Sequence, residues 1–198
     1  LKLLKKESLK HSMDLIKSDL KKLGIEHDNF FSETELIENK LVDKAVNHLK
    51  KNNYVQEGYL EPPKGESDKT WKKTKRLIFK STLFGDDTDR AMQKNDGSWT
   101  YFANDVGYHM DKVNRNYEYL IDVLGADHTG YVKRITAAVS ALSENKVKLN
   151  CKVCQLVKLY KNGKPFKMSK RSGDFISAQD LLNEVSKDSI RFMMLNRS

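Results

Sequence analysis

The stretch LIDVLGADHTGYVKRITAAVSALSENKVKLNCKVCQLVKLY, residues 120–160, determines the predicted fold. It opens with a compact apolar segment that ends at Gly125, which we predict to be a strand. An amphipathic helix follows over residues 129–143, and a second strand begins at Leu149. Strands that alternate with helices predict an α/β fold with a parallel sheet.

The segment before this stretch carries a turn signal. NDGS, residues 95–98, contains Asp-Gly and predicts a tight turn. We expect a strand in WTYFA, residues 99–103, and then a helix near residues 104–118. The strand–helix alternation would therefore begin before residue 120.

The first part of the chain has a different pattern. Apolar residues at helical spacing predict one helix over residues 8–23 and a second over residues 32–51. Ser32 and Glu35 have the spacing of a capping box at the start of the second helix. Short strands or hairpins should follow, with a loop at residues 61–70.

The last part of the chain reads as a turn and two helices. KNGKP, residues 161–165, should turn the chain back after the second strand. We expect a pair of helices after Ser177.

The chain is basic. It has 198 residues, and its 36 Lys and Arg against 27 Asp and Glu give a net charge of +9. A polyanionic partner such as nucleic acid or a nucleotide would explain this charge, and so would lysines that only solvate helix faces. No segment has the length of a membrane span and no signal peptide is visible, so we expect a cytoplasmic protein without membrane contact.

The two cysteines, Cys151 and Cys154, form a C-x-x-C pair. A zinc site would need two further ligands, and no second pair exists in the sequence. In a strand the two thiols would face opposite sides. We predict no metal site.

In open α/β sheets, ligands bind at the carboxyl ends of the strands. Two segments with polar side chains lie at such expected strand ends. In TYFAND, a turn from strand to helix would bring Tyr101 and Asp105 together, and a carboxylate suits a guanidinium. In GADHTG, Gly125 allows close approach, Asp127 could accept from ribose hydroxyls, and His128 adds a donor or acceptor. Both segments could instead contain only helix caps.

The third segment is PFKMSKRSGDF, residues 165–175. Lys167 and Lys170 on a loop could follow a polyphosphate and neutralise charge during phosphoryl or adenylyl transfer. A basic solvated turn is the alternative.

Together these motifs resemble the arginyl-tRNA synthetases of bacteria, which belong to class I of the aminoacyl-tRNA synthetases. KMSK, residues 167–170, matches four of the five positions of the class signature, and Arg171 stands at the fifth. LFGDDTDRAMQKNDGSWTYFANDVGYHMDKV and the run from GADHTG to the last residue also resemble this family. The resemblance is weakest over residues 59–77.

The resemblance implies ATP-dependent activation of L-arginine to arginyl-adenylate, and its transfer to tRNA(Arg) by a cytoplasmic, monomeric enzyme that uses ATP with Mg²⁺. Tyr101, Asp105 and His128 match residues that bind arginine. The residues that match those binding ATP and the adenylate in this family are Gly125, Asp127, Lys167, Met168, Ser169 and Lys170. The resemblance also implies that Lys167 and Lys170 act in catalysis.

The resemblance also implies a domain organisation. We expect a helical connecting segment (1–58), a hairpin or insertion region (59–96), the second half of a Rossmann-like catalytic domain with the KMSK loop (97–176), and the start of a helical segment (177–198). No histidine fits the other class signature, H-x-G-H. We therefore expect a fragment that is inactive alone.

Two alternatives remain. A non-catalytic basic module that binds nucleic acid would place its lysines on one face with exposed aromatics between them. Another class I synthetase would also contain KMSK, but the combination of YFAND with GADHTG favours arginine.

Overall fold

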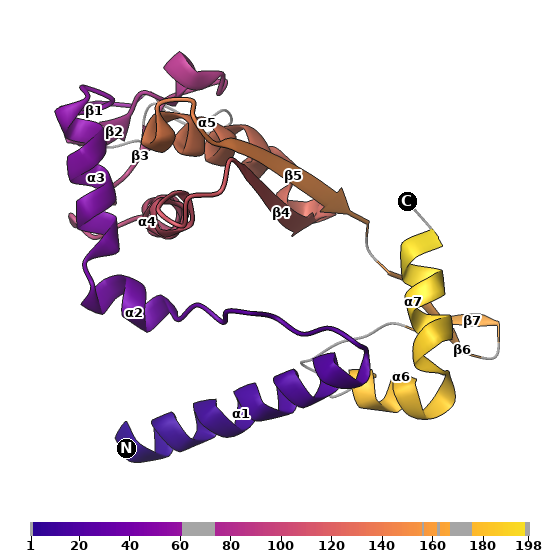
Figure 1. The fold of residues 1–198 in the computed structure, drawn as a ribbon. Helices are drawn as coiled ribbons and strands as arrows, with labels where there is room; N and C mark the ends of the chain where they lie inside the picture. Colours follow the sequence, from indigo (N-terminus) through magenta and orange to yellow (C-terminus); the bar gives the residue numbers. More distant parts are fainter. Residues whose placement is uncertain (1, 61–73, 156, 162, 167–175, 197–198) are drawn as a thin grey trace. The chain divides into compact units, whose positions relative to one another are not determined.

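The computed structural model describes residues 2–60, 74–155, 157–161, 163–166 and 176–196 (Figure 1). The chain divides into two compact units, residues 31–154 and residues 1–30 with 155–198. The segment boundaries expected at 58, 96 and 176 remain predictions, and the loop expected at residues 61–70 lies outside the described residues. Within the described residues, no helix is long and apolar enough to cross a membrane.

The unit of residues 31–154 is mixed α/β, which confirms the predicted fold class. Its helices are α2 (Glu33–Glu38), α3 (Leu41–Lys51), α4 (Tyr101–Val113) and α5 (Val132–Ser143), with 3-10 segments η1 (Ser81–Phe84) and η2 (Ala126–Tyr131). An antiparallel sheet contains β1 (Val55–Gly58), β2 (Arg76–Phe79) and β3 (Arg90–Ala91). A second sheet pairs β4 (Tyr119–Gly125) with β5 (Lys148–Cys154) in parallel.

The β4–α5–β5 segment has the arrangement expected from the sequence. β4 and β5 are in register from Tyr119 opposite Lys148 to Gly125 opposite Cys154. α5 packs against β5 and also against α4, which in turn packs against α3 (Figure 1). Small side chains of α5, including the buried Ala138, allow this close packing.

One face of β4 is buried and the other is exposed. Leu120 is buried, whereas Tyr119, Ile121 and Val123 on the opposite face are between 64% and 69% exposed. A parallel sheet is normally covered on both faces, so this apolar face is unusual for a strand of this kind.

The strand expected at residues 99–103 is not present. Thr100 is the N-cap of α4, and its hydroxyl accepts a hydrogen bond from the backbone N–H of Ala103. The same hydroxyl lies 3.1 Å from the carbonyl oxygen of Ala91, which ties the start of α4 to β3. The turn at Asp96-Gly97 is formed as expected, with Gly97 at a positive φ of 82°.

The helix expected over residues 32–51 is divided into α2 and α3. Lys40 takes the left-handed conformation between them, with a φ of 51°. The predicted capping box is wrong, because Ser32 is the N-cap residue of α2 but its side chain makes no capping hydrogen bond. The break lets both helices contribute to one core, through Leu36 in α2 and Val42 and Leu49 in α3.

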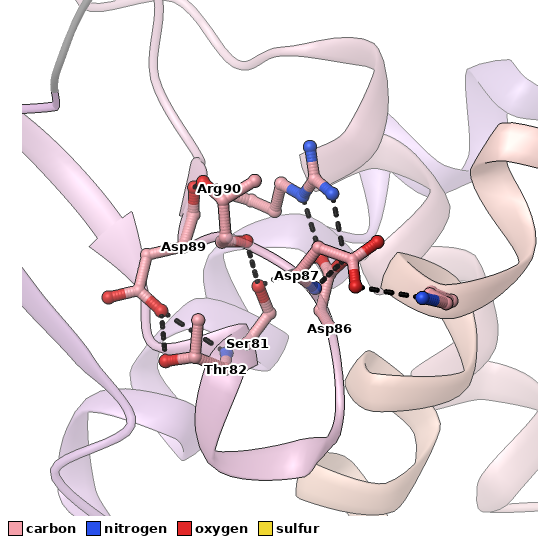
Figure 2. Close-up of polar contacts among 8 residues, drawn as sticks. Ser81, Thr82, Asp86, Asp87, Asp89 and Arg90 are labelled. Carbon is pink, nitrogen blue, oxygen red and sulfur yellow. Dashed lines mark hydrogen bonds and ion pairs between the residues drawn. The ribbon is translucent and has the colours of Figure 1, made fainter.

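A buried polar cluster of hydrogen bonds links η1 to the start of β3. The side chain of Asp86 is fully buried, and Arg90 donates from Nε and Nη2 to its two oxygens at 2.6 and 2.7 Å. Ser81 donates to the same carboxylate at 3.0 Å (Figure 2). Burial would raise the pKa of Asp86, but the hydrogen bonds from Arg90, Asp87 N–H and Ser81 lower it overall.

The other unit contains α1 (Lys2–Lys22), the hairpin of β6 (Leu159–Lys161) and β7 (Lys164–Phe166), α6 (Ala178–Glu184) and α7 (Lys187–Asn196). Ser177 and Asp180 form a capping box at the start of α6, and the pair of helices expected after Ser177 is confirmed. Arg191 of α7 donates to the carbonyl of Leu23, just after α1.

Candidate active site

The start of α4 presents the first pair of predicted site residues. Tyr101 is the first residue of α4 and Asp105 lies one turn later, so both are on the same helix face. Tyr101 is 82% exposed, and the Lys94 ammonium lies 5.7 Å from the centre of its ring. Neither Asn104 nor Asp105 caps the helix, because Thr100 has that position.

Asp105 is held by a residue that the sequence did not single out. The phenol of Tyr131, the last residue of η2, donates a hydrogen bond to Oδ2 of Asp105. Burial raises the pKa of Tyr131, and the Asp105 carboxylate raises it further. The phenol therefore stays protonated and remains a donor at physiological pH.

A second buried link joins α4 to the middle of β4. The Nε2 atom of His109 lies 2.8 Å from Oδ2 of Asp122, and Lys112 Nζ lies 2.7 Å from the other carboxylate oxygen. Burial would raise the pKa of Asp122, but the hydrogen bonds from His109 and Lys112 outweigh it and hold that pKa at about 2. Asp122 is thus ionised and faces two nitrogen donors.

The GADHTG segment forms the end of β4 and most of η2. A Cβ at Gly125 would lie 2.5 Å from Oδ1 of Asp127, so the absence of a side chain makes room for that carboxylate. His128 Nε2 lies 3.7 Å from Oδ2 of Asp127, and both side chains are more than half exposed. Neither side chain caps α5, since its N-cap residue is Tyr131 and makes no side-chain cap bond.

A pocket of about 410 Å³ lies between α4, the end of β4 and η2. Its polar lining contains the predicted residues Asp105 and His128, together with Tyr108, His109, Lys112, Asp122 and Tyr131; the Lys112 ammonium is paired with the Asp122 carboxylate. Its apolar walls include Ile121, Val123, Leu124 and Ile135. The structure thus brings Asp105 and His128 to one cavity, whereas Tyr101 and Asp127 are not part of its lining.

Lys167, Met168, Ser169 and Lys170 lie outside the described residues. Cys151 is half-buried and Cys154 exposed, and neither forms a disulfide. In the described part of the chain, no three His, Cys, Asp or Glu side chains are grouped to hold a metal ion.

Tyr131, His109 and Asp122 are the site residues that the sequence analysis missed. Asp122 interrupts the apolar segment LIDVL, and a charge within a buried strand is a signal that it has a partner. His109 lies four residues after Asp105, on the same face of α4. Tyr131 fits the apolar pattern of the following helix and so gave no separate signal.

The pocket suits a planar cation with several donors. Its carboxylate at Asp105 can accept two parallel N–H bonds from such a group. The end of β4 is also where a parallel sheet places nucleotide-binding groups.

Comparison with known proteins identifies the family of the chain. Residues 4–198 match the family described as "tRNA synthetases class I (R), catalytic domain". The chain belongs to this class I synthetase family. This membership confirms the resemblance seen in the sequence.

Several relatives of this synthetase family member are named arginine–tRNA ligase. The chain is 59% identical to that of Pelagibacter ubique over 191 residues, which is 96% of this chain and 33% of the relative. It is 55% identical to that of Roseobacter denitrificans over 93% of this chain and 32% of the relative. The chain therefore spans about a third of the length of these relatives.

A solved structure shares the fold. It is titled as a putative arginyl-tRNA synthetase from Campylobacter jejuni, and it is 30% identical with a TM-score of 0.74. The match covers 94% of this synthetase segment and 37% of the solved chain.

Proposed function

We propose that this chain is part of an arginine–tRNA ligase, which activates L-arginine with ATP and transfers it to tRNA(Arg). The observation that carries the proposal is the carboxylate of Asp105, which faces an apolar-walled pocket at the carboxyl end of β4. A guanidinium fits this carboxylate through two parallel hydrogen bonds.

The amino-acid site would use three residues. Asp105 would bind the guanidinium, Tyr101 would contact it from one helical turn earlier, and His128 would contribute from the other side of the pocket. A ligand without the guanidinium would leave the Asp105 carboxylate unpaired, which is how a polar site rejects analogues strongly. Lysine carries only a point charge and cannot match the planar fork.

The nucleotide site would begin at the end of β4. Gly125 and Asp127 would hold the adenylate, with the Asp127 carboxylate accepting from ribose hydroxyls. ATP would bind as a substrate with Mg²⁺. Its phosphates would be contacted by the KMSK residues Lys167, Met168, Ser169 and Lys170.

The reaction would proceed in two steps. The carboxylate of arginine attacks the α-phosphorus of ATP, and pyrophosphate leaves with the electrons of the broken phosphoanhydride bond. A hydroxyl at the tRNA 3′ end then attacks the carbonyl carbon of the adenylate, and AMP leaves. Lys167 and Lys170 would stabilise the negative charge that develops on pyrophosphate in the first step.

The proposal also covers the oligomeric state and the cellular location of the whole enzyme. We expect a monomer in the cytoplasm, without membrane contact. The exposed apolar face of β4, which contains Tyr119, Ile121 and Val123, would be covered by another part of the enzyme.

Arginine-dependent exchange of pyrophosphate into ATP tests the proposal. We would replace the aligned third of the Pelagibacter ubique arginine–tRNA ligase with this chain and assay the resulting chimera. We expect exchange that depends on L-arginine, and none from the 198-residue chain alone. A folded chimera that shows no such exchange would contradict the proposed function, and exchange by the isolated chain would overturn the expectation that it is inactive.

A further inference from the structure

The hydroxyl of Tyr131 makes a hydrogen bond that has no role in the reaction proposed above. It donates to Oδ2 of Asp105, although the two residues are 26 positions apart and lie on different elements. An aspartate on a helix surface has several accessible rotamers, and a bidentate partner fits only one orientation of the carboxylate plane. A donor fixed in space selects that orientation.

The ring of Tyr131 is itself held from three sides. Phe102 packs edge-on to it with centroids 6.3 Å apart, and His128 does the same at 6.5 Å. The guanidinium of Arg134 lies 5.3 Å from the ring centre. These contacts fix the phenol, so its oxygen is a rigid anchor for the carboxylate.

The contact leaves room for a ligand at Asp105. Among the described residues, no group donates a hydrogen bond to Oδ1 of Asp105, and the pocket lies beside this carboxylate. Oδ2 keeps one lone pair after accepting from the phenol. Both oxygens can therefore receive N–H groups while Tyr131 sets the plane.

We propose that Tyr131 is a positioning residue that orients the Asp105 carboxylate for L-arginine, and thereby sets the preference for a guanidinium over an ammonium. The inference rests on the proposed function. It also joins the two halves of the site, because Tyr131 ends the same η2 segment that carries Asp127 and His128.

The substitution Tyr131→Phe in the chimera described above tests this role, since it removes the hydroxyl and keeps the ring contacts. Tyr117→Phe is the matched control, because Tyr117 is 62% exposed and no hydrogen bond from its hydroxyl occurs within the described residues. The assay is arginine-dependent pyrophosphate exchange. It gives KM for arginine, KM for ATP and kcat, and the inhibition constant of L-lysine measures selectivity.

We expect Tyr131→Phe to raise KM for arginine about tenfold, the effect of losing one hydrogen bond to a charged group. KM for ATP, kcat and the lysine inhibition constant should each change by less than about threefold, because a single ammonium does not need the carboxylate plane to be fixed. Tyr117→Phe should leave all four values unchanged.

Other outcomes separate the two proposals. An inactive unmodified chimera would contradict the proposed function and, with it, this inference. An active chimera in which Tyr131→Phe leaves KM for arginine unchanged, or raises KM for ATP equally, would contradict the inference alone. A Tyr131→Phe chimera that no longer folds would also contradict it, because the hydroxyl would then be needed for stability and not for orientation.

Discussion

The imidazole of His109 bridges Asp122 on β4 and the backbone of its own helix. Its Nε2 atom lies 2.8 Å from Oδ2 of Asp122, and its Nδ1 atom lies 2.8 Å from the carbonyl oxygen of Asp105. Both partners are oxygen acceptors, so each ring nitrogen of His109 faces a hydrogen-bond acceptor. This bridge fixes the turn of α4 that carries the proposed arginine-binding carboxylate.

Replacement of Asp122 by Asn should destabilise the unit of residues 31–154. His109 and Lys112 would lose their anionic partner in a place where their side chains are only 6% and 18% exposed. We expect the free energy of unfolding to fall by about 2–3 kcal/mol in urea denaturation. Asp111→Asn on the same helix is the control and should cost less than about 1 kcal/mol, because the Asp111–Arg115 pair is about one-third exposed. Equal losses would argue against a buried ion pair.

The same carboxylate predicts the response to acid. The pKa of Asp122 is about 2 in the folded protein, against 3.8 for an ordinary Asp. A lowered pKa gives stability that is present above about pH 4 and is lost as the pH falls towards 2, with a total of about 2 kcal/mol. Denaturation series between pH 5 and 2 should show this loss, and Asp122→Asn should flatten it. An identical pH slope in both proteins would refute the assignment.

Arg90→Met should destabilise the protein, because it leaves the buried Asp86 carboxylate without its cationic partner. Methionine keeps most of the side-chain volume but removes both hydrogen bonds to a carboxylate that is fully buried. We expect a loss of about 3 kcal/mol in the free energy of unfolding. Lys133→Met breaks an ion pair with Asp87 in which both side chains are over 60% exposed, and it should leave the free energy of unfolding nearly unchanged. Similar losses in the two variants would contradict a special contribution of the buried Arg90–Asp86 pair to stability.

Gly107→Ala should weaken the packing of α4 on α3. A Cβ at Gly107 would lie 3.0 Å from the backbone N and Cα of Val42, which cannot move without shifting α3. Alanine favours a helix by about 1 kcal/mol over glycine, but overpacking of about 1–3 kcal/mol should exceed this gain. Gly130→Ala is the control, since no atom lies within 4 Å of its Cβ position. A Gly107→Ala protein as stable as the original would show that the helices tolerate a wider spacing.

The central part of the fold could be predicted because one continuous segment contains its whole pattern. The β4–α5–β5 segment has apolar strands and an amphipathic helix in direct succession, so local sequence and tertiary packing agree. WTYFA was misread because its aromatic and β-branched residues favour strands. The capping and tertiary hydrogen bonds of Thr100 override that preference and begin a helix.

Two residues that line the candidate pocket were predicted from the sequence, although Asp105 lies one turn into α4 and follows no strand, and their role in binding remains a prediction. Asp105 and His128 were found by their place in the sequence, and they line the same pocket. The partners that orient them are distant in sequence. Tyr131 is 26 positions from Asp105 and Asp122 is 13 positions from His109, and no spacing rule reports such pairs.

The central claim is that Asp105 binds the guanidinium of arginine. In the chimera, Asp105→Asn should raise KM for L-arginine at least about 100-fold, because it removes the charge of a bidentate contact. KM for ATP should stay within about twofold, and Asp111→Asn should change neither value. Pyrophosphate exchange measured over a range of arginine concentrations gives the result directly. An Asp105→Asn chimera with an unchanged KM for arginine would contradict the account.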